Sequence, residues 1–345
     1  MEKVIFKRNN TGFSKKLLDE VNIYFTNKSK KGTKILHVKT VTIFTLLISM
    51  YVYTLLSGHI ILFGVLGFLV ALVGFNIMHD ASHGSYSDNK KLNALLAFIG
   101  ADVMGGSSKF WSEKHNHLHH TYTNIVGMDD DIGKTPLFRL APSHQYKWFH
   151  KYQHIYCWFL YMFTTINWFY IDDFIVYTKK RIGTYSFTMS SKEVRLFWIG
   201  KSIHLVVFIL VPIILLGWKA LSGIVLLHGV ASLFLALVFQ MAHIVQGIEF
   251  HSHEEKELDE WYIHEVRTTA DFASKSPVWT LLLGGLNYQI EHHLFRHISH
   301  IHYPAISKIT HRICNEMGIL YTSFPTFRSA IYSHYKYLQK MGQRA

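Results

Sequence analysis

The stretch IILFGVLGFLVALVGFNIMHDASH at residues 60–83 decides the fold of this chain. Residues 60–78 carry no charged side chain, and as a helix rising ~1.5 Å per residue they extend ~28 Å, enough to cross a ~30 Å hydrocarbon core. His79 and His83 follow at once, so an α-helix that continues through them places both imidazoles on one face. The stretch predicts a membrane span that ends in a pair of histidines.

Three more apolar stretches complete two helical hairpins. Residues 41–57 precede the first span with only Gly58 and His59 between them, and residues 197–217 and 223–246 repeat the arrangement. Each stretch is long enough to span a bilayer as a helix. The sequence predicts an all-α membrane protein with four spans in two transmembrane hairpins and a cytosolic helical cap.

The distribution of charge predicts the orientation of these spans. Residues 1–40 hold ten Lys and Arg against three acidic residues. Such an arm can bind nucleic acid, but beside apolar spans it more simply indicates a segment kept in the cytoplasm. An even number of spans then places both termini and residues 79–196 on the cytoplasmic side. We therefore expect an integral, multi-pass protein with a basic arm (1–40), a membrane domain (41–310) and a cytosolic tail (311–345).

Two other apolar stretches are not counted as spans. Residues 154–171 hold eight aromatic side chains, which favour the membrane interface, and we predict that they lie there. Residues 94–106 are short and contain Asp102. The two cysteines, Cys157 and Cys314, have no paired spacing, so the sequence predicts neither a disulfide framework nor a thiolate metal site.

Histidines form three clusters in the segments predicted to be cytoplasmic. The chain has 24 histidines, and the clusters are His79-Asp-Ala-Ser-His83, His115-Asn-His-Leu-His-His120 and Gln289-Ile-Glu-His-His293. Neutral imidazoles are good ligands for first-row divalent metals. A lone HxxxH is more often an ordinary surface or core pair, but three clusters on one membrane face favour metal binding. Their seven regularly spaced histidines exceed what one six-coordinate ion can use, so we predict two metal ions.

The three clusters resemble the histidine boxes of the membrane fatty acid desaturase family. The resemblance extends to the longer stretches WSEKHNHLHHTYTN, HEVRTTADFA and GGLNYQIEHHLF, and it covers roughly residues 40–310. The glutamine that opens the third box is typical of the front-end subgroup, which desaturates between an existing double bond and the carboxyl end. Arg296 departs from the family, which often has proline at this position.

The resemblance implies an enzyme that uses O2 and two iron ions to desaturate a fatty acyl chain carried by CoA or a lipid. It also implies a separate electron donor, either a ferredoxin or cytochrome b5 with its reductase, and no nucleic-acid partner. A membrane hydroxylase is the alternative enzyme, and a metal transporter is the alternative of another class. The implied iron ligands are His79, His83, His115, His119, His120, His243, His292, His293 and, more weakly, Gln289.

Several neighbouring residues receive more modest predictions. Asp80 and Glu291 either orient ligand imidazoles or are solvated charges, and residues 129–131 are interpreted as a solvated acidic loop. His228 is expected not to bind metal, because it lies ~22 Å along the helix from His243. His117 lies off the box pattern. The remaining histidines near the third box are kept as pocket or outer candidates: His251, His253, His297, His300 and His302.

Overall fold

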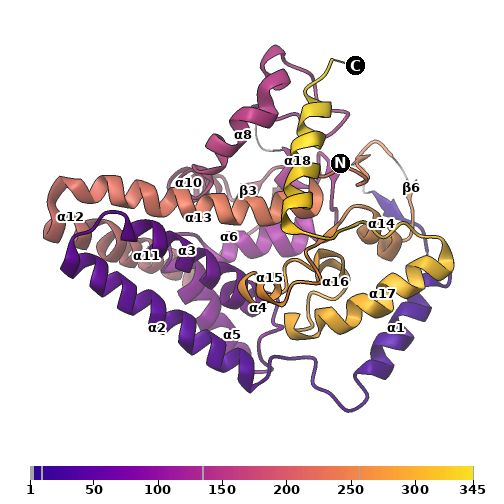
Figure 1. Ribbon diagram of the computed structural model, residues 1–345, viewed down its shortest axis with the longest axis horizontal. Coiled ribbons are helices and arrows are strands. Elements are labelled where there is room, and N and C mark those ends of the chain that lie inside the picture. Colours follow the sequence, from indigo (N-terminus) through magenta and orange to yellow (C-terminus); the bar gives the residue numbers. More distant parts are fainter. Residues whose placement is uncertain (1–3, 9–10, 134–135, 256, 345) are drawn as a thin grey trace. The chain divides into compact units, whose positions relative to one another are not determined.

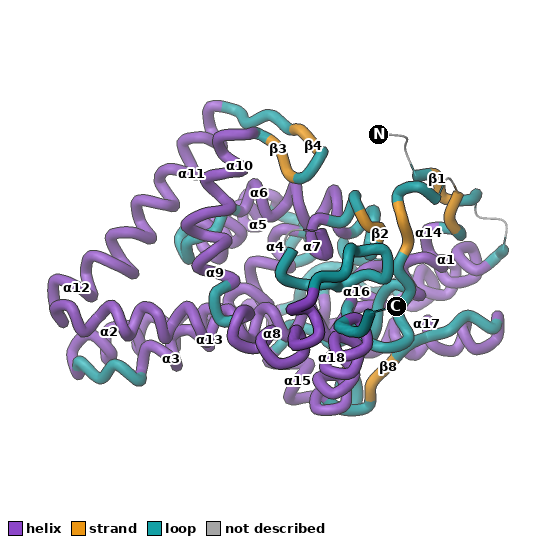
Figure 2. The backbone as a smooth tube through the Cα atoms, turned by 90° about the horizontal axis from the view of Figure 1, so that it is seen from above, coloured by secondary structure: helices purple, strands orange, loops and turns teal. Residues whose placement is uncertain are grey.

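The computed structural model describes residues 4–8, 11–133, 136–255 and 257–344, and it is mostly helical (Figures 1 and 2). The strands that it contains are two residues long, and they pair as β1 with β6, β2 with β5, β3 with β4, and β7 with β8. The chain divides into two compact units. Unit 1 comprises residues 1–31, 115–156 and 238–345, and unit 2 comprises residues 32–114 and 157–237.

Unit 2 contains the long apolar helices. Its first segments are α2 (Lys34–Ser57), α3 (Leu62–Val73), the π-helix η1 (Gly74–Met78), α4 (His79–Ser82), α5 (Lys90–Ala97), the π-helix η2 (Phe98–Asp102) and α6 (Ser108–Ser112). Next come α8 (Gln153–Tyr161), of which only residues 157–161 belong to this unit, α9 (Thr164–Asn167), η5 (Trp168–Asp172), α10 (Asp173–Lys179), β3 (Arg181–Ile182) and β4 (Tyr185–Ser186). The unit ends in α11 (Ser191–His204), η6 (Leu205–Leu210), α12 (Val211–Leu216), η7 (Gly217–Lys219) and most of α13 (Ala220–His243).

Three helical stretches among the described residues are long and apolar enough to cross a membrane: Lys34–Ser57, Leu62–Ser82 and Ser191–His243. On α2, large apolar side chains are exposed along the helix, including Ile48 at 62% and Leu56 at 82%. A surface of this kind suits lipid rather than water. The prediction of a mostly helical protein with membrane spans is therefore confirmed at this level.

The third of these stretches folds back on itself. The ring centroids of His204 and His228 lie 6.2 Å apart, whereas a straight α-helix would separate residues at this spacing by ~36 Å. The reversal falls at Gly217, which ends α12 with a φ of 67°. Figures 1 and 2 show the chain turning back at the end of α12 into α13. The stretch therefore forms a helical hairpin, as the apolar pattern predicted.

Unit 1 is built from shorter elements. They are β1 (Ile5–Phe6), α1 (Phe13–Tyr24), β2 (Ile125–Val126), α7 (Asp130–Gly133), η4 (Trp148–Tyr152), β5 (His251–Ser252), β6 (Glu257–Leu258), α14 (Trp261–Arg267), β7 (Asp271–Phe272), α15 (Pro277–Leu282), α16 (Gln289–Leu294), η8 (His300–His302), α17 (Tyr303–Met317), β8 (Ser323–Phe324) and α18 (Phe327–Met341). The π-helix η3 (Glu113–His119) begins at its edge. Helix α17 has proline in its first turn and ends at Gly318 with a φ of 67°, the usual signals for starting and stopping a helix.

The ends of the chain belong to the packed structure of this unit. Phe13 and Leu17 of α1 are fully buried and pack in one apolar cluster with Ile306 and Ile313 of α17. At the other end, Leu338 of α18 is also fully buried. Helices α1 and α18 therefore contribute buried side chains to the core of this unit. An amphipathic helix of ordinary composition gives no sequence signal for the surface that covers it.

One glycine allows two helices of unit 2 to approach closely, which generates a prediction. A Cβ atom on Gly67 of α3 would lie 2.2 Å from the carbonyl oxygen of Leu227 on α13. We expect Gly67→Ala to force α3 and α13 apart and to destabilise the protein by about 1–3 kcal/mol. Thermal unfolding of detergent-purified protein measures the effect.

The matched control for this prediction is Gly74→Ala. A Cβ atom on Gly74 would make only an ordinary contact, at 3.5 Å from Leu235. This variant should unfold within a few degrees of the wild type. Equal unfolding temperatures for the two variants would show that Gly67 does not set the approach of the helices.

Candidate metal centre

Three buried histidines from distant parts of the chain meet in unit 1. His119 ends η3, His243 ends α13 and His293 lies on α16, and one ligand atom from each lies within 4.8 Å of the others. Their ring centroids are separated by 4.7 Å for His119 and His243, 5.0 Å for His119 and His293, and 4.7 Å for His243 and His293. Each side chain is at most 4% exposed. This trio is the best-defined group of potential metal ligands within one unit.

Each member of the trio has its Nδ1 atom beside an oxygen acceptor. His293 Nδ1 lies 2.7 Å from Glu265 Oε2, and His119 Nδ1 lies 3.1 Å from Asp129 Oδ2. His243 Nδ1 lies 3.3 Å from the carbonyl oxygen of Thr268. An acceptor at Nδ1 holds the proton there and leaves the Nε2 lone pair for a metal, as is common for histidine ligands.

The opposite nitrogens fit this interpretation. Nε2 of His119 and Nε2 of His243 are buried and have no hydrogen-bond partner among the described residues. Burying a polar atom without a partner costs free energy, so such atoms usually face a bound ligand or water. The residues present therefore fit a metal ion held by imidazole nitrogens.

The local charge also suits a cation. Burial lowers the pKa of His119, but Asp129, Asp131 and Glu265 raise it more, so that the net result is a pKa of about 9. Burial raises the pKa of Glu265 to about 8, against the opposing effects of Thr123 and His119. The acidic groups that stabilise a proton on His119 equally stabilise a metal cation, which would displace that proton on binding.

The second box folds as a π-helix rather than an α-helix. Its residues form the π-helix η3, and the backbone N–H of His120 donates to the carbonyl of His115 over 3.0 Å, an i→i+5 bond. His115 and His120 are therefore one turn apart, and their Nε2 atoms lie 3.1 Å from each other. Single π-turns are frequent at functional sites. The wider turn brings the side chains of His115, His119 and His120 to one side of the helix, whereas a regular α-helix would turn His120 away from His115.

The third box lies on the short helix α16. Asp271 accepts a hydrogen bond from the backbone N–H of Ile290 and so caps the start of this helix. His292 and His293 on α16 form a second potential ligand group with His120, all three buried. Gln289 is also buried, and its Nε2 atom has no hydrogen-bond partner within the described ranges.

Glu291 does not orient an imidazole in the way that sequence analysis allowed. Tyr321 donates to Asp271 over 2.6 Å and lies 3.1 Å from Glu291, so the two carboxyl groups meet around one phenol. Burial and the neighbouring Asp271 raise the pKa of Glu291. Glu291 is part of the packing behind α16, because its side chain points to another side of the helix than those of His292 and His293.

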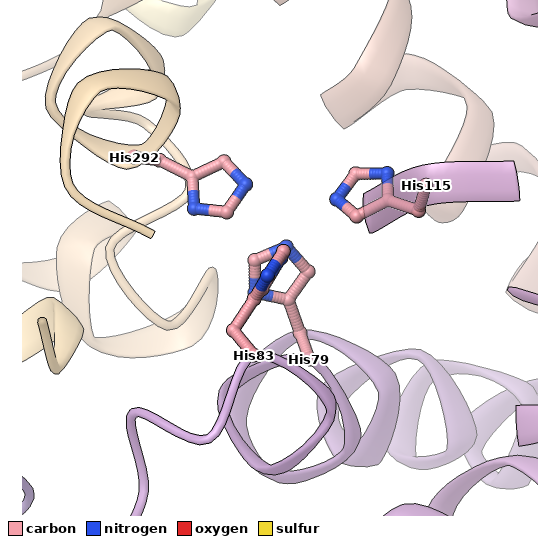
Figure 3. Close-up of side chains that lie close together, drawn as sticks. All are labelled: His79, His83, His115 and His292. Atoms are coloured by element: carbon pink, nitrogen blue, oxygen red, sulfur yellow. The ribbon is translucent and has the colours of Figure 1, made fainter. Parts of the chain in front are cut away.

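The first box lies in unit 2, on the helix that follows η1. The rings of His79 and His83 lie 4.6 Å apart on one helical face, as predicted, and both contact Trp111 edge-on at 5.6 and 5.7 Å. Figure 3 shows these two imidazoles projecting together from the end of the helix. The same figure shows the rings of His115 and His292, which lie 5.9 Å apart and nearly parallel within unit 1.

The acidic loop near residue 130 was predicted to be solvated, and for Asp129 this is wrong. Asp129 is 1% exposed and holds both His119 Nδ1 and the backbone N–H of Asn124. A run of three aspartates suggests solvent exposure, but the chain folds the first of them against the second box. Sequence analysis also missed Glu265 and Thr268. The HEVRTTADFA stretch that contains them was noticed only as part of the resemblance.

The other histidines lie elsewhere. His228 is hydrogen-bonded to Thr165 and Tyr170 inside unit 2, at 2.9 and 3.1 Å. His117 is exposed, and His251 pairs with Glu255 at 3.0 Å. None of these three belongs to a potential ligand group among the described residues. Of the remaining pocket candidates, His253 lies beside the carbonyl of Val126, His302 beside the hydroxyl of Tyr24, and His300 and His297 are buried and exposed, respectively.

Comparison with known proteins agrees with the geometry. The family model for fatty acid desaturase matches residues 53–325. An sn-1 linoleoyl-lipid 6-desaturase of Arthrospira platensis is 36% identical over 96% of this chain and 92% of its own length. Its counterpart in Synechocystis is 33% identical over 96% of each chain. An acyl-lipid (8-3)-desaturase of Physcomitrium patens is 35% identical over 80% of this chain and 59% of its own length.

The match thus includes all three histidine boxes and His243, and the relatives are desaturases over nearly the whole chain. The buried imidazoles that the fold brings together could hold a metal ion. This chain belongs to the fatty acid desaturase family.

Proposed function

We propose that this chain is a membrane enzyme that uses O2 and two histidine-bound iron ions to introduce a cis double bond into a lipid-linked acyl chain. The observation that carries the proposal is the buried trio of His119, His243 and His293 in a member of the desaturase family. Their Nδ1 atoms lie beside oxygen acceptors, which prepares their Nε2 atoms to bind metal.

The proposed ligand set follows from the number of imidazoles. The trio would share one ion, and His120 and His292, the two members of the neighbouring group that the trio does not use, support a second. Six positions on one ion cannot accommodate all the histidines of the three boxes. The proposed ligands are the nine residues His79, His83, His115, His119, His120, His243, His292, His293 and Gln289.

When bound, the iron pair would supply the redox chemistry by which one O2, two electrons and two protons convert CH2–CH2 into CH=CH and two waters. The protein would hold the imidazoles in one tautomer through Asp129, Glu265 and the carbonyl of Thr268. Burial of these groups keeps bulk water away from the reacting site.

The substrate proposal rests on the relatives. The Arthrospira and Synechocystis proteins are each named sn-1 linoleoyl-lipid 6-desaturase. Together with the glutamine that opens the third box, this supports an acyl-lipid substrate and front-end regiochemistry. We propose that the two electrons come from a separate ferredoxin or cytochrome b5 system.

The proposed membrane topology has four passes, with both termini and all three boxes on the cytoplasmic side. The basic residues near the N-terminus support this orientation. Residues 154–171 would lie in the interface. On α8, Ile155 and Phe159 are exposed at 61% and 62% and lie four residues apart, thus on one face of the helix. Phe163, in the turn after α8, is exposed at 40%, and its ring lies 5.0 Å from that of Phe159.

Product analysis tests the reaction. In a host that contains linoleoyl lipids, expression with a ferredoxin or cytochrome b5 system should yield a new cis double bond on the carboxyl side of the existing bonds. Mass spectrometry with double-bond location measures it, and His119→Ala should abolish the product. Purified protein given only O2, lipid and NAD(P)H should not turn over. A hydroxylated lipid as the product would instead establish the hydroxylase alternative.

Iron analysis tests the ligand set with two histidines of the same helix. His243→Ala should lower the iron content and abolish desaturation, because it removes one member of the buried trio. His228→Ala is the matched control and should keep the iron content, because its ring bonds Thr165 and Tyr170. Full iron occupancy in folded His243→Ala protein would refute this ligand.

Cysteine labelling tests the topology at two exposed positions. Ser143→Cys and Arg328→Cys lie on either side of the aromatic segment, and both side chains are exposed. Both cysteines should react with an impermeant reagent only from the cytoplasmic side, while Cys157 and Cys314 are buried. Labelling of Arg328→Cys from the outside alone would mean that residues 154–171 cross the membrane.

A further inference from the structure

Thr123 and Asn124, three and four residues after the last histidine of the second box, lie at the centre of the hydrogen bonds around the trio. Both are fully buried. Asn124 has a φ of 56°, in the left-handed region, which asparagine adopts more readily than most residues other than glycine. An uncommon backbone conformation costs free energy, so it is kept only where contacts with the surrounding structure stabilise it.

Thr123 contacts the acceptor of one histidine. Its hydroxyl lies 2.9 Å from Glu265 Oε2, the same oxygen that lies beside His293 Nδ1. The hydroxyl is also 3.2 Å from His293 Nδ1 and 2.8 Å from the carbonyl of His119. Its one proton can go to either oxygen, and in both cases the side chain stays fixed between Glu265, His293 and the end of the second box.

Asn124 contacts the acceptors of the other two histidines. Its backbone N–H donates over 3.0 Å to Asp129 Oδ2, the oxygen that lies beside His119 Nδ1. Its side-chain Nδ2 donates over 3.3 Å to the carbonyl of Thr268, the acceptor for His243 Nδ1. The same amide donates to the carbonyl of His243 itself over 3.0 Å.

The contacts of Thr123 and Asn124 involve the oxygen acceptor of every histidine in the trio. Glu265, Asp129 and the carbonyl of Thr268 orient His293, His119 and His243, and two consecutive residues hold all three acceptors. We propose that the dipeptide Thr123–Asn124 is the positioning element of the metal centre, setting the direction of the three imidazoles together. The inference rests on the proposed function, since it assumes that the trio binds metal.

The chemistry of each side chain explains why these residue types are needed. Thr123→Ser keeps the hydroxyl, and Thr123→Val keeps the shape but removes the hydrogen bond. Asn124→Gly keeps the backbone N–H and allows the left-handed φ but removes the amide. Asn124→Asp keeps the shape and places a carboxyl oxygen against the carbonyls of His243 and Thr268, where a donor is required.

The experiment measures metal affinity and not only activity. The full-length protein is purified in detergent, its metal is removed with a chelator, and Co²⁺ is titrated back in competition with an indicator. Thr123→Val, Asn124→Gly and Asn124→Asp should bind Co²⁺ about 10- to 100-fold more weakly than wild type, as for other residues that orient ligands. Their visible Co²⁺ spectra should change, while Thr123→Ser should restore both affinity and spectrum.

A control separates positioning from general stability. Thr310 is as buried as Thr123, but its hydroxyl donates to the carbonyl of Ile306 within its own helix. Thr310→Val should keep the wild-type affinity and spectrum, even if its thermal stability in the metal-free state falls as far as that of Thr123→Val. Equal losses of Co²⁺ affinity in both valine variants would overturn the inference.

His119→Ala and His293→Ala distinguish the two levels of the proposal. If these variants bind Co²⁺ as tightly as wild type, the metal centre itself is wrong. If they lose Co²⁺ while Thr123→Val and the folded Asn124 variants keep wild-type affinity, the centre stands and the positioning role fails. Should the Asn124 variants not fold, the comparison of Thr123→Val with Thr123→Ser decides alone, and equal affinity in those two variants overturns the inference.

Discussion

Several histidines in this protein are buried next to carboxylates, and this combination constrains much of unit 1. A buried imidazole or carboxylate is costly unless its polar atoms are satisfied. Asp129 and Glu265 satisfy the Nδ1 side of His119 and His293, each at no more than 1% exposure. The Nε2 atom of His119 is buried without a hydrogen-bond partner among the described residues, which suits a metal ligand. The chain segments that supply these groups must therefore meet at one place with little freedom to move.

The packing of unit 1 provides that rigidity. Helix α16 is short, but Asp271 caps its start, and Ile290 and Leu294 anchor it in the apolar cluster shared with α1 and α17. The buried polar residues around it are hydrogen-bonded to one another, so displacing one of them leaves its neighbours without a hydrogen-bond partner. Apolar packing and this hydrogen-bond network together can keep a fixed set of imidazoles in a water-poor site of a membrane desaturase.

Much of this could be predicted because its signals are local. A helix crosses a membrane by length and apolar composition alone, and a histidine at i and i+4 faces its partner whatever the rest of the chain does. The presence of apolar helices long enough to span a membrane and the pairing of His79 with His83 therefore followed from the sequence, and the family followed from the boxes. The second box shows the limit, because composition does not reveal that its turn is a π-helix.

By itself, the sequence determined the membrane class, the family and the histidine boxes, since each depends on a short continuous stretch of apolar residues or on histidines at a fixed spacing. Only the tertiary structure decided which oxygens orient those histidines. Glu265 lies 28 residues from His293, and the Asn124 amide reaches Thr268 across 144 residues. No local pattern specifies such pairs, because they arise where separate segments close around one buried point, and so an aspartate that looked solvated became a partner of His119.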